Sequence, residues 1–203
     1  MIIGITGGTG CGKTTLLGLI EERGGLILDC DAIYHQLLVS DQALLTAIEN
    51  RFPGTVTDGV LQRKKLGVIV FSDKAALLDL NRITHCAVKQ EVLRRLENKP
   101  APAAIDAIAL FEGELAQLCD VTVAVTAPAD VRIRRLMARD GISEEYAARR
   151  IAAQHSDAWF REQCDYILEN SGTEPEFRDK CLAFFAQLGI MEEKTEKENL
   201  YDQ

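Results

Sequence analysis

Short apolar runs alternate with amphipathic stretches along most of this chain. The apolar runs lie at 2–6, 26–30, 103–110, 121–126 and 165–168. They are bounded mostly by turn residues, as is typical of strands buried on both faces. The stretches between them predict helices. This alternation predicts a mostly parallel sheet with helices on both faces.

The alternation stops between about residues 32 and 99. Helical runs are expected there at 41–51, 62–71 and 74–97, separated by a Phe52-Pro53-Gly54 turn and an Asp58-Gly59 turn. We expect a helical insertion beside the strand ends, where it forms a wall for an acceptor substrate.

A second helical region is expected at 130–155. Asp140-Gly141 divides it into a pair of helices, and Ser143 is placed to cap the second one. The proline-rich segment 98–102 predicts a stiff linker back to the sheet. The charged tail from Met191 has few apolar residues and is expected to fray.

Composition narrows the class of protein. The chain has 203 residues, 47% of them hydrophobic, which suffices for one sizeable core. No apolar stretch approaches the roughly 20 residues that span a bilayer, and the N-terminus has no signal-peptide pattern. We therefore expect a cytoplasmic protein without a membrane partner. The net charge of −8, without a Lys/Arg-rich tract, argues against a nucleic-acid partner.

The strongest motif lies near the N-terminus. Gly7, Gly12, Lys13 and Thr14 satisfy the pattern G-x-x-x-x-G-K-[ST], between a predicted strand and a predicted helix. In that setting backbone N–H groups surround an anion, Lys13 reaches the β/γ-phosphates and the Thr14 hydroxyl binds Mg²⁺. The motif predicts binding of a nucleoside triphosphate. Cys11 lies inside the loop, where we expect access for alkylating reagents.

Two aspartates follow the next predicted strand, and ligands of open α/β sheets bind at that edge. Asp31 is a candidate base for an attacking hydroxyl or a ligand of Mg²⁺ through water. The alternative is that Asp29 and Asp31 only cap the next helix.

Asp106 stands in an otherwise uncharged strand, Ala-Ala-Ile-Asp-Ala-Ile. A buried carboxylate is costly unless it is paired or bound to a cation. We predict a role beside Mg²⁺, against the alternative of an exposed strand end.

Arginines gather in the second helical region, where Arg132, Arg135 and Arg139 share one face. For Arg139 we predict a phosphate clamp, because guanidinium groups match phosphate oxygens. For the other arginines we expect a solvated face paired with Asp130, Asp140 and Glu144. His85 either contacts a substrate phosphate or caps a helix turn.

Taken in order, these residues resemble the dephospho-coenzyme A kinase family. The matching segments are Gly-Ile-Thr-Gly-Gly-Thr-Gly-Cys-Gly-Lys-Thr-Thr at 4–15, Leu-Asp-Cys-Asp at 28–31, Asp-Gly-Val-Leu-Gln-Arg at 58–63, Leu66, Val70-Phe71, His85, Leu-Phe-Glu at 110–112, Arg135-Leu136, Met-Ala-Arg-Asp-Gly-Ile-Ser at 137–143, Gln154, Asp-Tyr-Ile at 165–167 and Asn-Ser-Gly at 170–172.

The resemblance implies one P-loop kinase domain with a parallel five-stranded sheet flanked by helices. Its nucleotide-binding core is expected at about 1–31 and 101–190, a helical acceptor-binding insertion at 32–99, a lid at 130–155 and a frayed tail at 191–203.

The implied reaction moves the γ-phosphoryl group of ATP, with Mg²⁺, to the ribose 3′-hydroxyl of dephospho-coenzyme A, a small-molecule partner. The implied catalytic residues are Asp31, Lys13 and Arg139. The ATP contacts fall on Gly10, Cys11, Gly12, Lys13, Thr14 and Thr15, the acceptor contacts on Asp31, Arg63 and His85, and the metal ligands on Thr14 and Asp106.

The chain departs from the family's pattern on the acceptor side. His35 stands where an arginine is frequent, Cys86 where a proline follows the histidine, and Ile108-Ala109 where Pro-Leu is usual. Two alternatives therefore stay open: a P-loop kinase for another nucleoside or nucleotide, and a weakly catalytic nucleotide-binding protein.

Overall fold

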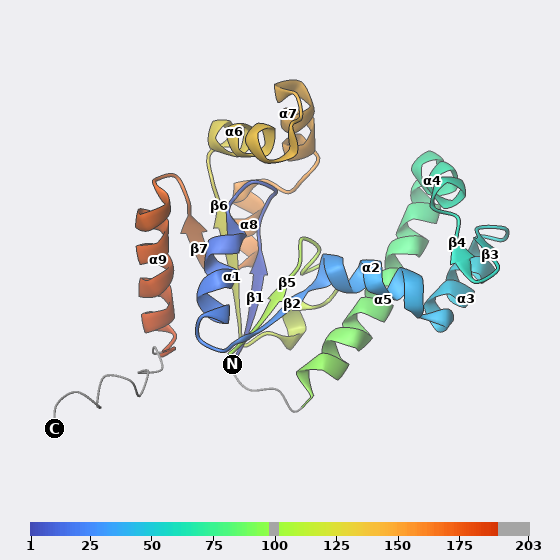
Figure 1. Cartoon of the computed structure of the whole chain (residues 1–203), viewed down its shortest axis with the longest axis horizontal. Coiled ribbons are helices and arrows are strands. Elements are labelled where there is room, and N and C mark those ends of the chain that lie inside the picture. Colours follow the sequence, from blue (N-terminus) through green and yellow to red (C-terminus); the bar gives the residue numbers. More distant parts are fainter. Residues whose placement is uncertain (98–101, 191–203) are drawn as a thin grey trace. The chain divides into compact units, whose positions relative to one another are not determined.

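Five strands form one sheet in the order β2-β5-β1-β6-β7 (Figure 1). The computed structural model describes residues 1–97 and 102–190. The strands are β1 (Ile2–Thr6), β2 (Leu26–Asp29), β5 (Ala103–Asp106), β6 (Val121–Thr126) and β7 (Tyr166–Glu169). β1 pairs in parallel with β5, and β6 with β7. The predicted parallel sheet flanked by helices is confirmed. Residues 98–101 of the linker predicted at 98–102, and the tail from 191, lie outside the described residues.

Two of the predicted strands are shorter than the apolar runs suggested. The strand expected at 103–110 ends at Asp106, because the chain then turns and Leu110 O accepts bonds from the N–H groups of Leu115 (2.9 Å) and Ala116 (3.0 Å). The strand expected at 26–30 ends at Asp29, whose side chain accepts from Ala32 N at 2.9 Å and so starts a helix at Cys30.

The chain forms two compact units. Unit 1 comprises Met1–Thr6 and Ile27–Thr122, and unit 2 comprises Gly7–Leu26 and the described residues from Val123 onward. The additional elements of unit 1 are α2 (Cys30–Ser40), α3 (Gln42–Arg51), β3 (Val56–Thr57), β4 (Val60–Leu61), α4 (Arg63–Ser72), α5 (Lys74–Leu96) and a 3₁₀ turn at Ala116–Leu118.

The long helix α5 is the centre of the helical part of unit 1, and α2, α3 and α4 all pack against it (Figure 1). Its buried residues Ala76, Leu80, Thr84, Val88 and Val92 recur every fourth position, so they form one continuous stripe. The helices predicted at 41–51, 62–71 and 74–97 are confirmed as α3, α4 and α5. The antiparallel pair β3–β4 was not predicted, because two residues per strand leave no periodic signal.

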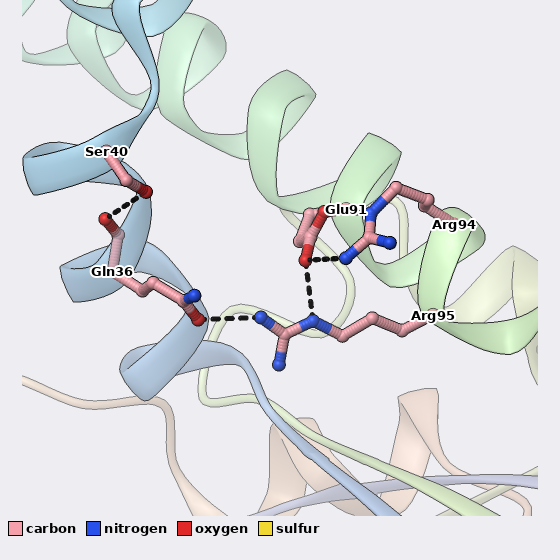
Figure 2. Close-up of polar contacts among 5 residues, drawn as sticks. All are labelled: Gln36, Ser40, Glu91, Arg94 and Arg95. Carbon is pink, nitrogen blue, oxygen red and sulfur yellow. Dashed lines mark hydrogen bonds and ion pairs between the residues drawn. The ribbon is translucent and has the colours of Figure 1, made fainter.

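A polar link joins α2 to α5 (Figure 2). Arg95 donates from Nε to Glu91 Oε1 at 2.6 Å and from Nη2 to Gln36 Oε1 on α2 at 2.7 Å. Arg94 also donates to Glu91, at 2.7 and 2.8 Å. These hydrogen bonds, that of Arg94 foremost, lower the pKa of Glu91 to about 2. The ionised Glu91 thus orients the arginine that holds α2.

Unit 2 contains the predicted pair of helices. Its helices are α1 (Lys13–Glu21), α6 (Ala129–Asp140), α7 (Glu144–Ala152), α8 (Asp157–Gln163) and α9 (Glu174–Gln187). α1 packs on α9, and α6 packs on α7 (Figure 1). Gly141 ends α6 in the left-handed conformation (φ 65°), and Ser143 Oγ accepts from Tyr146 N at 3.2 Å at the start of α7. The break and the cap are confirmed. No helix in the described ranges has the length and apolarity needed to span a membrane.

Candidate active site

The phosphate loop of unit 2 has the backbone that its glycines require. Gly7, Gly10 and Gly12 have φ values of 130°, 78° and 89°, which disfavour other residues. A Cβ atom at Gly7 would also collide with the carbonyl oxygen of Val125, and one at Gly12 with the side-chain amide of Asn170. The loop is therefore tightly enclosed by its own unit.

Two features make the mouth of this loop attractive to an anion. Gly12 is the N-cap of α1 and supplies no side-chain hydrogen bond, and the first turn of α1 has no acidic residue. The ammonium group of Lys13 donates to Gly7 O at 3.0 Å, so it lies across the loop. The first N–H groups of a helix together with a lysine attract phosphate.

Two arginines support the loop from α6, contrary to our expectation. Arg132 donates to Thr9 O at 2.9 Å, and Arg135 donates to Gly10 O and Cys11 O at 3.4 Å. The prediction of a solvated face is wrong for both, because long-range contacts with backbone carbonyls replace ion pairs on the helix. It is confirmed for Arg134, which pairs with Asp130 at 3.0 Å.

Gln154 and Asn170 complete this support, and sequence reasoning gave them no role. Gln154 Oε1 accepts from Thr9 N at 2.9 Å, while Asn170 donates to Cys11 O at 2.9 Å and accepts from Arg135 at 3.1 Å. The only available signal was their presence among the family matches.

The thiol of Cys11 is buried, so the expected access for alkylating reagents is wrong. Its side chain is 1% exposed, because it lies among residues of its own unit such as Ala127 and Arg132. Burial raises the pKa of the thiol, and the nearby charges of Arg132 and Lys13 oppose that rise only in part.

Arg139 lies in the last turn of α6 and is exposed. It donates to Asp140 at 2.7 and 3.1 Å, and Arg150 from α7 donates to the same carboxylate at 2.7 Å. The hydrogen bonds from Arg139 and Arg150 lower the pKa of Asp140 to about 2. Arg139 and Arg150 are therefore held by one carboxylate at the end of the α6–α7 hairpin, the pair of helices that Gly141 connects.

Unit 1 contains a cavity of about 210 Å³ with mixed polar and apolar walls. Asp31 from the first turn of α2 and His85 from α5 both line it. His85 Nδ1 lies 3.2 Å from Glu112 O and makes a hydrogen bond with it. The other lining residues are Cys30, Tyr34, Leu80, Asn81, Thr84, Val88, Ala107, Ile108, Ala109, Gly113 and Leu115.

Carboxylates gather beside this cavity. Burial raises the pKa of the Cys30 thiol to about 12, and the charges of Asp106, Asp29 and Asp31 add to the rise. Asp106 is the partly buried last residue of β5. Carboxylate and hydroxyl oxygens suit Mg²⁺, which uses few protein ligands and several phosphate or water oxygens. Within the described ranges, no three His, Cys, Asp or Glu side chains form a metal cluster.

Arg63 borders a second cavity of unit 1, about 180 Å³ in volume. Tyr34 and Leu80 line both cavities, so the two are neighbours. Leu66, Val70 and Phe71 make the second one largely apolar, and Phe71 is 85% exposed. Burial raises the pKa of Tyr34, and the charge of Arg63 opposes this rise. Arg63 thus places a cationic group at the border of this second, largely apolar cavity, the apolar groove.

The sheet order and the phosphate loop define a P-loop kinase fold. The chain belongs to the dephospho-CoA kinase family, which matches residues 1–176. A dephospho-CoA kinase of Corynebacterium diphtheriae is 35% identical over 178 residues, covering 85% of this chain and 89% of that protein.

Solved structures agree with the fold. TT1252 from Thermus thermophilus is 33% identical with a TM-score of 0.75, and the match covers 93% of this chain and 97% of that one. A dephospho-CoA kinase from Campylobacter jejuni shares the fold, with a TM-score of 0.66 at 24% identity, over 94% of this chain and 98% of that one.

Proposed function

We propose that this chain transfers the γ-phosphoryl group of ATP to the ribose 3′-hydroxyl of dephospho-CoA in the cytoplasm, giving CoA and ADP. This is the last step of CoA synthesis. One observation carries the proposal: a phosphate loop of the required geometry occurs in a chain that matches the dephospho-CoA kinase family over residues 1–176. Neither another nucleoside acceptor nor a weakly catalytic binder is favoured by these relatives.

On the nucleotide side, backbone N–H groups of residues 10–15 bind the β- and γ-phosphates, and Lys13 neutralises them. The Thr14 hydroxyl and the Asp106 carboxylate are the proposed protein ligands of Mg²⁺. The ion, when bound, neutralises charge that develops on the phosphate oxygens. Arg139 is proposed to act on the same charge when the α6–α7 hairpin closes.

On the acceptor side, Asp31 orients the 3′-hydroxyl and accepts its proton. The bond from the 3′-oxygen to the γ-phosphorus forms, and the bond from that phosphorus to the β–γ bridging oxygen breaks, so ADP leaves. His85 and Asn81 line the cavity proposed for the ribose. The adjoining apolar groove suits the pantetheine arm, and Arg63 at its border suits the diphosphate.

The test is an assay of ADP release with ATP, Mg²⁺ and a panel of acceptors: dephospho-CoA, adenosine and other nucleosides. Mass spectrometry identifies the product. We expect turnover with dephospho-CoA and one added phosphate on its ribose. Turnover with a nucleoside but none with dephospho-CoA would overturn the proposal. A parallel series with GTP tests the choice of ATP.

A further inference from the structure

A buried guanidinium lies behind the phosphate loop of unit 2. Arg132 is 4% exposed. Its Nε donates to Thr9 O at 2.9 Å, and its Nη2 donates to Gln154 Oε1 at 2.7 Å. The same Gln154 oxygen accepts from Thr9 N at 2.9 Å. Arg132 and Gln154, together the Thr9 clamp, therefore hold both backbone polar groups of one loop residue.

The charge of Arg132 has no counter-charge in contact with it. Both of its acceptors are neutral oxygens, and no carboxylate in the described part of the chain forms an ion pair with it. On the same helix, the exposed Arg134 and Arg139 each pair with an aspartate. A buried cation without a carboxylate is costly, so its presence calls for a compensating role.

We propose that Arg132 and Gln154 are positioning residues of the nucleotide site, and that the phosphates of the bound nucleotide supply the counter-charge of Arg132. The clamp acts through the Thr9 peptide, which it fixes so that the following N–H groups converge on the phosphates. Burial leaves the charge of Arg132 poorly screened, so it attracts phosphate without touching it. The inference rests on the proposed use of a nucleoside triphosphate.

Gly8 shows that the loop and the Thr9 clamp are fitted to each other. Its φ lies outside the left-handed region, so φ alone does not require glycine here. A Cβ atom there would collide with Nη2 of Arg132 and lie 2.9 Å from Oε1 of Gln154. Glycine at this position therefore makes room for the clamp.

The central test substitutes Arg132→Met, which keeps the length and removes the charge. Isothermal titration with ATP, the KM for dephospho-CoA and the melting temperature without nucleotide are measured on the whole protein. We expect ATP affinity to fall about tenfold to a hundredfold, because the variant loses a poorly screened charge and also the charge-assisted hydrogen bond that fixes the Thr9 peptide. The KM for dephospho-CoA should stay unchanged. The melting temperature should hold or rise, because methionine carries no buried charge.

The matched control is Arg134→Met on the exposed face of the same helix, which should match wild type in all three measurements. A structural role for Arg132 would lower the melting temperature and leave ATP affinity within about twofold of wild type, which would overturn the inference. A loss of ATP affinity that is explained by a lower melting temperature would also overturn the inference. Failure of the wild type to bind ATP would instead refute the proposed function.

If Arg132→Met does not fold, the variants Gly8→Ala and Arg132→Lys test the Thr9 clamp instead. Gly8→Ala displaces the clamp while keeping the charge of Arg132 inside the fold. Arg132→Lys keeps the charge but not the pair of hydrogen bonds to Thr9 O and Gln154 Oε1. Both should weaken ATP binding, and normal affinity in both would refute the clamp. Where the methionine variant folds, adding Gly8→Ala to it should cost little more, because contacts that share partners are not additive.

Discussion

At the scale of single residues, Asp29 and Asp31 of unit 1 differ in their surroundings. The Asp29 carboxylate caps α2 through Ala32 N at 2.9 Å. Asp31, in the first turn of α2, lines the cavity and is not the residue that caps the helix. The capping alternative therefore describes Asp29, and the carboxylate of Asp31 is the one that we propose for the substrate hydroxyl.

This difference predicts opposite results for two like substitutions. Asp31→Asn should lower kcat by about 10²–10⁴-fold, the usual worth of a positioned general base, because the amide does not accept the proton. Both KM values should change little. Asp29→Asn is the control and should retain wild-type rates, since asparagine caps a helix about as well as aspartate. Steady-state kinetics with each substrate varied in turn measure these effects, and near-normal turnover of Asp31→Asn would rule out its role as the base.

Residues within one motif could be predicted from the sequence, whereas residues that meet across the chain could not. The spacing of Gly7, Gly12, Lys13 and Thr14, between a predicted strand and a predicted helix, is enough to locate the phosphate loop. The contact of Arg132 with Thr9 depends on a sequence separation that no local pattern encodes. The expected access of reagents to the Cys11 thiol was wrong for a related reason: a loop pattern does not say which of its side chains are buried.

At the scale of elements, the α6–α7 hairpin has a fixed base and an exposed end. Arg132 and Arg135 attach the base of α6 to the phosphate loop, and Arg139 lies at the other end with Asp140 and Arg150. The end with Arg139 should open locally more easily than the base, because buried hydrogen bonds oppose opening only at the base.

Arg139→Ala should therefore affect the rate more than nucleotide binding. We expect the Kd for ATP to stay close to that of wild type and kcat to fall about 10²-fold, because the guanidinium acts on charge in the closed complex. Arg149→Ala, on the exposed face of α7, serves as the control and should be neutral. Titration calorimetry and initial rates give the two numbers. Equal losses of affinity and rate would show that Arg139 binds the ground state.

The link between α2 and α5 predicts a pH-dependent stability. The pKa of Glu91 is held at about 2 in the folded chain, below its ordinary value of 4.5. Its ionised form thus stabilises the fold above about pH 4.5, and this contribution disappears as the pH falls toward 2. Glu91→Gln should lower the free energy of unfolding by about 1–2 kcal/mol near neutral pH. This value is smaller than the whole pKa shift of Glu91 would imply, because Arg94 is exposed and its charge is screened by solvent.

Urea unfolding at about pH 7 and about pH 2 measures this contribution. The stabilities of wild type and Glu91→Gln should differ at the higher pH and converge at the lower one. Glu145→Gln, whose partner Arg149 lies 3.9 Å away on the surface, should change stability little at either pH. A difference between wild type and Glu91→Gln that persists at low pH would contradict the role of the charge.

Element types were easier to predict than element ends. Long periodic runs identified α3, α4 and α5, since each buries a regular stripe of apolar residues. The ends depended on single hydrogen bonds, such as the one from Ala32 N to Asp29 that moves Cys30 from strand to helix. Strands of two residues, as in β3–β4, fall below what any periodicity detects.

At the scale of the whole molecule, the alternation of short apolar runs with amphipathic stretches predicted the parallel sheet flanked by helices, because this alternation is typical of such a sheet. The break in that alternation marked the helices that line the cavity with Asp31 and His85. The grouping of the chain into two compact units was not apparent, since Met1–Thr6 and Ile27–Thr122 join one unit across the phosphate loop and α1. Each unit therefore draws on segments distant in sequence.

The two units predict two separable footprints in amide hydrogen exchange. ATP with Mg²⁺ should protect residues 7–26 and the α6–α7 hairpin most strongly, because the phosphates fix the loop that Arg132 and Arg135 attach to α6. Dephospho-CoA alone should protect α2 and α5, which line the cavity of unit 1. In Lys13→Ala the ATP footprint should vanish and transfer should nearly cease, while the dephospho-CoA footprint should persist, because only the charge at the β/γ-phosphates is lost. An ATP footprint centred on α2 and α5, or a wild-type footprint in Lys13→Ala, would assign the triphosphate to a different site.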